Sequence, residues 1–203
     1  MLLAINPHHP QPRLIAQVVS VLKAGGVIAY PTDTTYGIGC SIFSKKGLEL
    51  IYQIKQRDRR KPFSFICADL SEVARFARLT NHAFKIMKRC LPGPYTFVLQ
   101  ASREVPDLLT TRQKTVGVRM PDHPICSALV RELGNPIVTT SANLSGEEPV
   151  GDPLEINRQF GSQLNLVIDG GLLTTDVSSV VSLVGDRIEI LREGSGDLAR
   201  ILG

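Results

Sequence analysis

Hydrophobic residues follow helical and extended patterns that alternate from one end of the chain to the other. Between Leu14 and Leu22 the apolar residues share one helical face, and Gly25-Gly26 follows as a helix stop. The next segment, residues 27–30, is a short apolar run that breaks at Pro31. This change of pattern predicts a helix followed by a buried strand that leads into a loop.

The same criteria predict the remaining elements. We expect further strands at residues 2–5, 63–67, 95–100, 115–120, 137–140, 166–168, 177–184 and 188–191. We expect helices at residues 46–56, 125–133 and 153–160, and two more whose N-caps are Ser71 and Asn81. Pro92-Gly93-Pro94 ends the second of these. Helices and strands that alternate in this way predict an α/β fold with one mixed sheet.

Composition favours a single domain that spans residues 1–203. With 203 residues and 43% hydrophobic content, the chain can bury a sizeable core. Residues 1–7 lack the charged region and apolar run of a secretory signal, and no apolar stretch has the length needed to cross a bilayer. The four cysteines form no Cys-x-x-Cys pair, so neither a zinc site nor a disulfide framework is expected. These features predict a cytoplasmic protein that does not act at a membrane.

The strongest charge feature is the run from Lys55 to Lys61. It holds five cations and one carboxylate, and this excess of +4 equals the formal net charge of the whole chain. One or two cations near a helix C-terminus would offset the helix dipole, but five exceed what a dipole of about half a charge needs. Pro62 favours a helix end here, which would let Lys55 and Arg57 reach one ligand. The run therefore favours a phosphate-rich ligand, either a nucleotide triphosphate or RNA.

Two polar segments directly follow buried strands. Residues 139–146 read Thr-Thr-Ser-Ala-Asn-Leu-Ser-Gly, and residues 31–37 read Pro-Thr-Asp-Thr-Thr-Tyr-Gly. Hydroxyl and amide groups at a strand end can bind a small polar ligand through directed hydrogen bonds. The same groups can equally cap their own loops, and the spacing leaves both interpretations open.

Arg119 lies on the otherwise apolar strand expected at residues 115–120. A buried arginine needs an anion nearby. Its partner is either an internal Asp or Glu, which the residues themselves favour, or the carboxylate or phosphate of a ligand.

The usual nucleotide-binding and hydrolase signatures are absent from the sequence. It contains no Gly-x-x-x-x-Gly-Lys-Ser/Thr loop, no Gly-x-Gly-x-x-Gly fingerprint and no Gly-x-Ser-x-Gly elbow. An anionic ligand would therefore have to be held by the basic and hydroxyl-bearing segments described above.

The most specific segments are Lys55-Gln56-Arg57 and Ser141-Ala142-Asn143. Supporting segments occur in order at residues 31–37, 91–97, 118–121 and 191–194. Together they resemble the YrdC/YciO family, which includes the L-threonylcarbamoyladenylate synthases of tRNA modification, over nearly the whole chain. The opening residues 5–11 and the closing residues 194–198 look closer to the YciO branch of that family.

The resemblance implies a twisted mixed sheet flanked by helices, with a large positively charged cavity. It also implies a reaction in which L-threonine, bicarbonate and ATP, with Mg²⁺, give threonylcarbamoyl-AMP and pyrophosphate for the N6-threonylcarbamoyladenosine modification of tRNA. No metal held by the protein itself is implied, and other tRNA-modification proteins are implied as partners. Carried over residue by residue, the resemblance puts Lys55, Arg57, Lys61, Thr115, Asn143 and Arg192 at ATP, and Thr34, Arg119, Ser141 and Ser179 at threonine. Of these, Lys55, Arg57, Ser141 and Asn143 would carry the chemistry.

The alternative is a module that binds double-stranded RNA or tRNA through the same basic residues without catalysis. A nonspecific phosphate binder has no need of a hydroxyl and amide pocket, so Thr34 and Ser141-Ala142-Asn143 favour the enzyme. The chain departs from the synthase pattern at two places. A nucleotide-contacting polar residue after the Ser-x-Asn loop appears here as Gly151. Where a synthase typically has a ligand-contacting His in a Pro-Leu-Ile-Val-His stretch, this chain reads Pro62-Phe63-Ser64-Phe65-Ile66.

Overall fold

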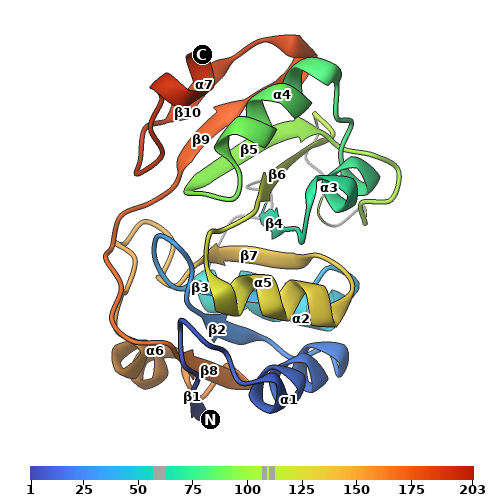
Figure 1. Ribbon diagram of the computed structural model, residues 1–203. Helices are drawn as coiled ribbons and strands as arrows, with labels where there is room; N and C mark the ends of the chain where they lie inside the picture. The colour runs from blue at the N-terminus through green and yellow to red at the C-terminus, as the bar shows by residue number, and fades with distance from the viewer. Residues whose placement is uncertain (57–62, 107–108, 110–112) are drawn as a thin grey trace.

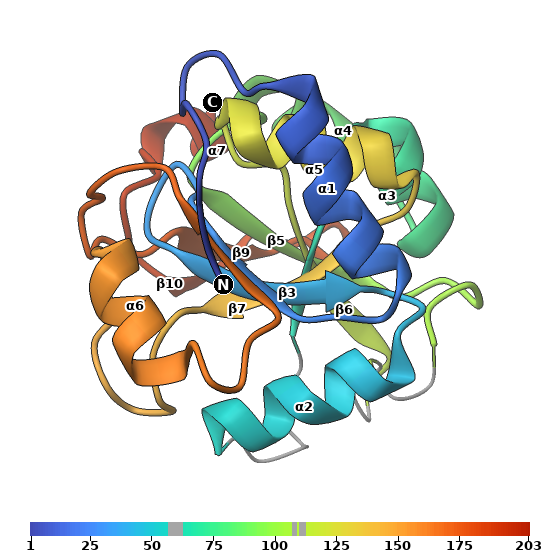
Figure 2. The same ribbon diagram turned by 90° about the horizontal axis from the view of Figure 1, so that it is seen from below.

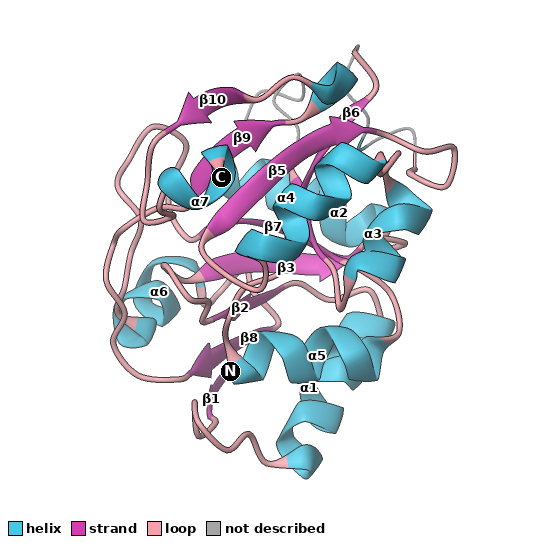
Figure 3. Ribbon diagram, turned by 45° about the horizontal axis from the view of Figure 1, so that its top comes forward, coloured by secondary structure: helices cyan, strands magenta, loops and turns pink. Residues whose placement is uncertain are grey.

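The computed structural model describes residues 1–56, 63–106, 109 and 113–203. Its strands form one twisted sheet in the order β1-β8-β2-β3-β7-β4-β6-β5-β9-β10 (Figures 1 and 3). The bounds are β1 Leu2–Ala4, β2 Ile28–Tyr30, β3 Gly37–Ser41, β4 Ser64–Ile66, β5 Tyr95–Gln100, β6 Thr115–Arg119, β7 Ile137–Ser141, β8 Leu166–Asp169, β9 Ser179–Ser182 and β10 Glu189–Arg192. β2 pairs in parallel with β8 and antiparallel with β3, so the predicted mixed sheet is confirmed.

Helices cover the sheet on two sides. Their bounds are α1 Pro12–Lys23, α2 Lys45–Lys55, α3 Leu70–Phe76, α4 Asn81–Cys90, α5 Pro124–Leu133, α6 Pro153–Phe160 and α7 Ala199–Leu202. Seen from below, α1 and α5 lie together on one side of the sheet, while α2 and α6 lie on the other (Figure 2). The predicted α/β class with flanking helices is therefore confirmed. In the part of the chain that the structure describes, no helix has the length and apolar character of a membrane span.

Two separate hydrophobic clusters fill the space between these layers. Ile28 on β2 packs with α1 and α5 in one cluster, whereas its neighbour Ala29 faces the other cluster. Successive side chains of a strand point to opposite faces, so a three-residue strand can contribute to both cores. The central strands are thus buried on both sides and give the sheet a rigid frame.

Both predicted N-caps of the middle helices are wrong by one or two residues. α3 is capped by Asp69, whose carboxylate accepts from the backbone N–H of Glu72 at 2.8 Å. α4 is capped by Thr80, whose hydroxyl accepts from the N–H of Ala83 at 3.1 Å. Aspartate and threonine are as good caps as serine and asparagine, so residue type alone could not choose among neighbouring candidates.

The strand expected at residues 177–184 is shorter than its apolar pattern indicates. β9 covers Ser179–Ser182, and a 3₁₀ turn at Val184–Asp186 follows it. Val177 and Ser178 precede the strand and line the cavity described below. This shift by two residues affects which serine can reach a ligand.

No strand is expected from the sequence at β3, where glycine alternates with other residues. Gly39 is required there, because a Cβ atom at this position would lie 2.4 Å from the carbonyl oxygen of Val138 on β7. Glycine weakens a strand pattern and also marks the close approach of another backbone. Glycine therefore makes β3 difficult to recognise in the sequence, and it also lets β3 pack closely against β7.

Candidate functional site

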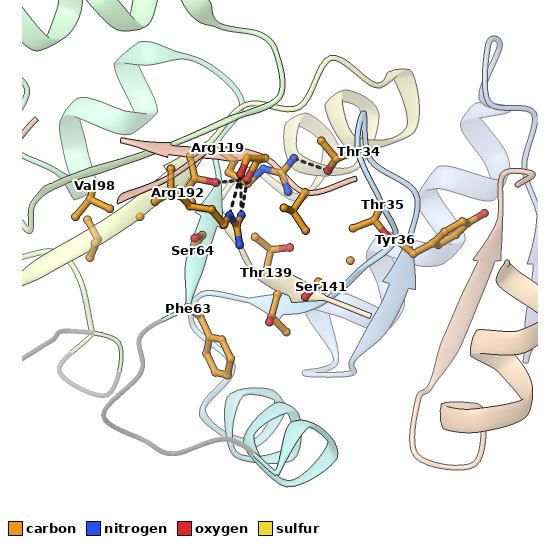
Figure 4. A pocket seen from close by; sticks show the side chains of 18 of the residues that line it. Thr34, Thr35, Tyr36, Phe63, Ser64, Val98, Arg119, Thr139, Ser141 and Arg192 are labelled. Carbon is orange, nitrogen blue, oxygen red and sulfur yellow. Dashed lines mark hydrogen bonds between the residues drawn. The ribbon is translucent and has the colours of Figure 1, made fainter. Parts of the chain in front are cut away.

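A cavity of about 440 Å³ lies over the central strands of the sheet (Figure 4). The loop at residues 34–37 and strands β4, β5, β6, β7, β9 and β10 contribute to its walls. Most of the polar groups that line it are hydroxyls of serine and threonine, and its charged groups among the described residues are Arg119 and Arg192. A hydroxyl-rich cavity with two guanidinium groups suits a ligand that carries several oxygen atoms and negative charge.

The floor of the cavity is a row of residues in register across four strands. Thr139 on β7 pairs with Ser64 on β4, Ser64 pairs with Gly117 on β6, and Gly117 pairs with Val98 on β5. Residues that pair directly across a sheet point to the same face. All four residues line the cavity, so its shape follows from strand register.

Arg119 is held at one side of the cavity by an internal carboxylate. Its guanidinium donates to Asp33 at 2.9 Å and to the hydroxyl of Thr34 at 3.1 Å. Burial raises the pKa of Asp33 above its ordinary value, and the charge of Arg119 opposes that rise. The expectation of an internal partner is thus confirmed, yet the buried Nε of Arg119 has no hydrogen-bond partner among the described residues.

Arg192 is held differently, by uncharged groups. Its Nε and NH2 donate to the carbonyl oxygen of Ser178 at 3.1 and 2.8 Å, and NH2 also lies 3.3 Å from the Ser178 hydroxyl. That hydroxyl is in turn 2.8 Å from the hydroxyl of Thr96. Burial, and secondly repulsion from Arg119, lower the pKa of Arg192. Within the described part of the chain, no carboxylate forms a salt bridge with Arg192.

Lys55 lies outside the cavity lining, where its side chain holds the loop that follows β7 in place. Its Nζ donates to the carbonyl oxygen of Ser141 at 2.7 Å and to Oδ1 of Asn143 at 2.8 Å. The Asn143 side chain also accepts from the Ser141 hydroxyl at 2.6 Å and donates to the carbonyls of Leu144 and Glu147. Lys55 is only 1% exposed. The loop therefore caps itself, as one interpretation expected, while Ser141 lines the cavity, so that ligand binding by this loop stays a prediction.

The structure brings together some of the residues expected at the site and separates others. Thr34, Thr115, Arg119, Ser141 and Arg192 line the cavity. Arg57 and Lys61 lie outside the described residues.

Ser179 is fully buried and lies outside the cavity lining. Its hydroxyl donates to the carbonyl oxygen of Gly196 at 2.8 Å and accepts from the N–H of Gly194 at 3.0 Å.

The positive charge expected for the cavity stays a prediction, since Asp33 already compensates Arg119 and most of the basic run lies outside the described residues.

Sequence reasoning missed Asp33, Ser64, Thr96 and Ser178 as parts of the site. Asp33 lies inside the polar segment at residues 31–37, and that segment was the available signal for it. The other three are isolated hydroxyls on β4, on β5 and just before β9, where no local pattern separates a cavity position from a solvated one. Only the strand pairing places them beside the arginines.

Potential metal ligands do not gather elsewhere in the described residues. His, Cys, Asp and Glu side chains form no group of three or more there that could hold a metal ion.

Comparison with known proteins gives a consistent family. The Sua5/YciO/YrdC family model, whose description is "Telomere recombination", matches residues 20–194. The protein named "Uncharacterized protein YciO" of Escherichia coli (strain K12) is 42% identical over 200 residues, which cover 98% of this chain and 97% of the relative. The "Threonylcarbamoyl-AMP synthase" of Vibrio vulnificus (strain YJ016) is 37% identical over 159 residues, which cover 77% of this chain and 86% of the relative.

Solved structures agree with these sequence matches. The crystal structure of E. coli YciO superposes with a TM-score of 0.95 and 40% identity, covering 99% of this chain and 98% of that one. The structure of P. abyssi Sua5 complexed with L-threonine superposes with a TM-score of 0.92 and 28% identity, covering 99% of this chain. This chain spans 59% of the length of that Sua5 chain.

Proposed function

Because the chain belongs to the Sua5/YciO/YrdC family, we propose that it is an enzyme that makes L-threonylcarbamoyladenylate from L-threonine, bicarbonate and ATP. The product would serve the N6-threonylcarbamoyladenosine modification of tRNA. The observation that carries the proposal is the cavity itself, in which Arg119 and Arg192 lie among serine and threonine hydroxyls. Charged donors and hydroxyls together suit a substrate that carries carboxylate and phosphate oxygens.

The threonine would lie between Arg119, Thr34 and Ser141. Its carboxylate would accept from the guanidinium of Arg119, which lines the cavity. The Ser141 hydroxyl donates to Asn143, so its oxygen would be left to accept from the substrate nitrogen. We assign Ser179 a structural role in place of a contact with threonine, because its hydroxyl already holds Gly194 and Gly196 in place.

The ATP would lie against Thr115 and Arg192, which both line the cavity. Arg192 would face the phosphates, and Lys55 and Asn143 would hold the loop that follows β7. Arg57 and Lys61 keep their expected place at the triphosphate. Mg²⁺ would arrive with ATP and stay on its phosphate oxygens, because the described cavity lining carries hydroxyls and no carboxylate.

The reaction joins two anions, so attraction and positioning would supply most of the catalysis. The amine of threonine first forms a bond to the carbon of bicarbonate, and a C–O bond of bicarbonate breaks as water leaves, which gives the carbamate. A carbamate oxygen then forms a bond to the α-phosphorus of ATP, while the bond from that phosphorus to the bridging oxygen breaks and pyrophosphate leaves with the electron pair. Guanidinium groups that are already positioned before the ligand binds would stabilise the negative charge that accumulates in this step.

The test is to incubate the purified protein with MgATP, bicarbonate and labelled L-threonine. We expect pyrophosphate and labelled adenylate in equal amounts, and neither product when threonine or bicarbonate is omitted. Replacement of threonine by serine or another amino acid tests whether the site accepts a different amine. If no pyrophosphate is released and only salt-sensitive RNA retention is found, the synthase proposal is wrong and the RNA-binding alternative replaces it.

A further inference from the structure

The hydroxyl of Ser64 occupies the middle of the cavity floor and has no hydrogen-bond partner among the described residues. Ser64 lines the cavity and is partly exposed to it. Among the described residues, no side chain or backbone group bonds to its Oγ, whereas Thr96, Ser141 and Ser178 are all committed to neighbours. A hydroxyl can both donate and accept, so Ser64 brings an unused donor and acceptor to the ligand.

The neighbours of Ser64 leave its hydroxyl open to the cavity. On one side it pairs with Thr139, whose hydroxyl is bonded to Tyr30. On the other side it pairs with Gly117, which has no side chain. A Cβ atom at Gly117 would lie 2.7 Å from Oγ of Ser64, so the glycine leaves the room that this hydroxyl uses. Figure 4 shows Ser64 on β4 at the cavity, between Phe63 and the two arginines.

The position of Ser64 along the strands decides which part of a ligand it can touch. Thr115, Gly117 and Arg119 alternate along β6 on the cavity face, and Ser64 is level with the middle residue, Gly117. A strand rises about 3.3 Å per residue, so Ser64 is level with a point about 7 Å from both Thr115 and Arg119. Register places Ser141 level with Thr115, and Arg192 level with Arg119, so residues assigned to each substrate lie at both ends of this row. Ser64 therefore lies in the middle of the region that the two substrates would share.

We propose that Ser64 contacts the linkage that joins the two substrates, the mixed anhydride between the carbamoyl carboxyl group and the α-phosphate. This inference rests on the proposed function. The Ser64 hydroxyl donates to an oxygen of the linkage as the new bond forms, when the negative charge of both substrates meets there. Because this group exists only after the substrates have joined, the hydrogen bond favours the reaction step and the product over either substrate.

The test compares the wild type with Ser64→Ala, and with Ser182→Ala as a matched control. Ser182 is a buried strand serine outside the cavity lining, so its variant loses the same hydroxyl without touching a ligand. The probes are ATP, L-threonine and a stable analogue of the adenylate in which a sulfamoyl group replaces the phosphate. Binding is measured by calorimetry and turnover by pyrophosphate release, with thermal unfolding as a check on folding.

For Ser64→Ala we expect about tenfold weaker binding of the analogue and about tenfold lower kcat, as for the loss of one hydrogen bond to a charged group. Affinities for ATP and for threonine should stay within about twofold of the wild type. Ser182→Ala should match the wild type in every assay.

Each other outcome gives a clear decision. Equal analogue binding by the wild type and Ser64→Ala overturns the inference, whether or not the protein turns over. A tenfold loss of affinity for ATP alone, or for threonine alone, would assign Ser64 to that substrate. This outcome also overturns the inference. If the wild type binds the analogue but makes no adenylate, the proposed function fails, while the affinity ratio still decides the role of Ser64. If the wild type does not bind the analogue at all, both proposals fail.

Discussion

Two arginines face the same cavity, but the protein supports them in opposite ways. Arg119 forms a salt bridge with Asp33, and both side chains are nearly buried, at 12% and 8% exposure. Arg192 is held by the carbonyl and hydroxyl of Ser178, with no carboxylate bound to it among the described residues. The first charge is compensated inside the protein, whereas the second is not. We therefore expect Arg119 to contribute a directed hydrogen bond to a ligand, and Arg192 to contribute net attraction.

The difference separates stability from binding. A buried ion pair gives little net stability, but removing one partner is costly because the other charge stays behind. An arginine held by neutral groups leaves no charge behind when it is removed. The comparison therefore predicts that one arginine is needed for folding as well as for binding, and that the other is needed for binding alone.

The largest effect is expected for Arg119→Gln. Asp33 would lose its counter-ion in a buried site, so the free energy of unfolding should fall by about 3–5 kcal/mol. Urea denaturation measures the loss, and calorimetry should show no threonine binding.

The control is the double variant Arg119→Gln with Asp33→Asn, which removes both charges. It should recover most of the lost stability but none of the threonine binding. A double variant as unstable as Arg119→Gln would mean that the guanidinium stabilises the fold by packing, and the comparison would lose its basis.

The second effect is expected for Arg192→Gln. Its stability should stay within about 1 kcal/mol of the wild type, while ATP binding weakens roughly 10- to 100-fold, as for lost charged hydrogen bonds. Arg187→Gln removes an equal charge from an exposed position just before β10 and is the matched control. If both variants lose the same affinity, general electrostatic attraction explains the effect, and Arg192 has no specific place at the ligand.

The sequence predicted much of this arrangement, because the elements that carry it have strong patterns. α6 and β5 have the expected bounds, and the position of Arg119 on an apolar strand correctly indicated a buried anion beside it. The sequence left open whether that anion is an internal carboxylate or belongs to a ligand. The structure holds the internal one and still leaves Nε of Arg119 without a partner among the described residues.

What the sequence could not give depends on strand ends and pairing. Side chains alternate between the two faces of a strand, so an error of one residue moves a side chain to the opposite side. Ser178 and Ser179 are neighbours in the chain, yet Ser178 lines the cavity and Ser179 is buried away from it. Ser64 likewise became visible as a site residue only through its pairing with Gly117 and Thr139, which are distant in sequence.

The third effect concerns the pH dependence of stability, because the groups that hold Asp33 and Arg119 in place are next to titratable residues. Asp33 accepts from the N–H of Asp122, and the next residue, His123, caps α5 by accepting from the N–H of Ile125 at 3.2 Å. Burial, and secondly repulsion from His8, lower the pKa of His123 from 6.5 to about 4, and Asp122 opposes the shift. The support of Arg192 consists of the neutral Ser178 and Thr96.

Because the folded protein binds this proton less readily than the unfolded chain, the contribution of His123 is complete above pH 6.5 and is lost as the pH falls toward 4. We expect the free energy of unfolding to fall by about 1–2 kcal/mol more in the wild type than in His123→Asn over this range. Asparagine caps a helix without titrating, so it is the matched control. Parallel pH profiles from urea denaturation would show that the His123 cap does not titrate in this way.

The smallest effect is expected for Ser178→Ala, which tests how Arg192 is positioned. The backbone carbonyl of Ser178 keeps its two bonds to the guanidinium, while the hydroxyl loses its link to Thr96 and its weaker contact with NH2 of Arg192. ATP binding should weaken by about three- to fivefold, as for one neutral hydrogen bond. Thr96→Val breaks the same link from the other side, so the double variant should lose little more than either single one. Additive losses, or a loss as large as that of Arg192→Gln, would mean that these hydroxyls touch the nucleotide themselves, and Arg192 would then be one ligand among several.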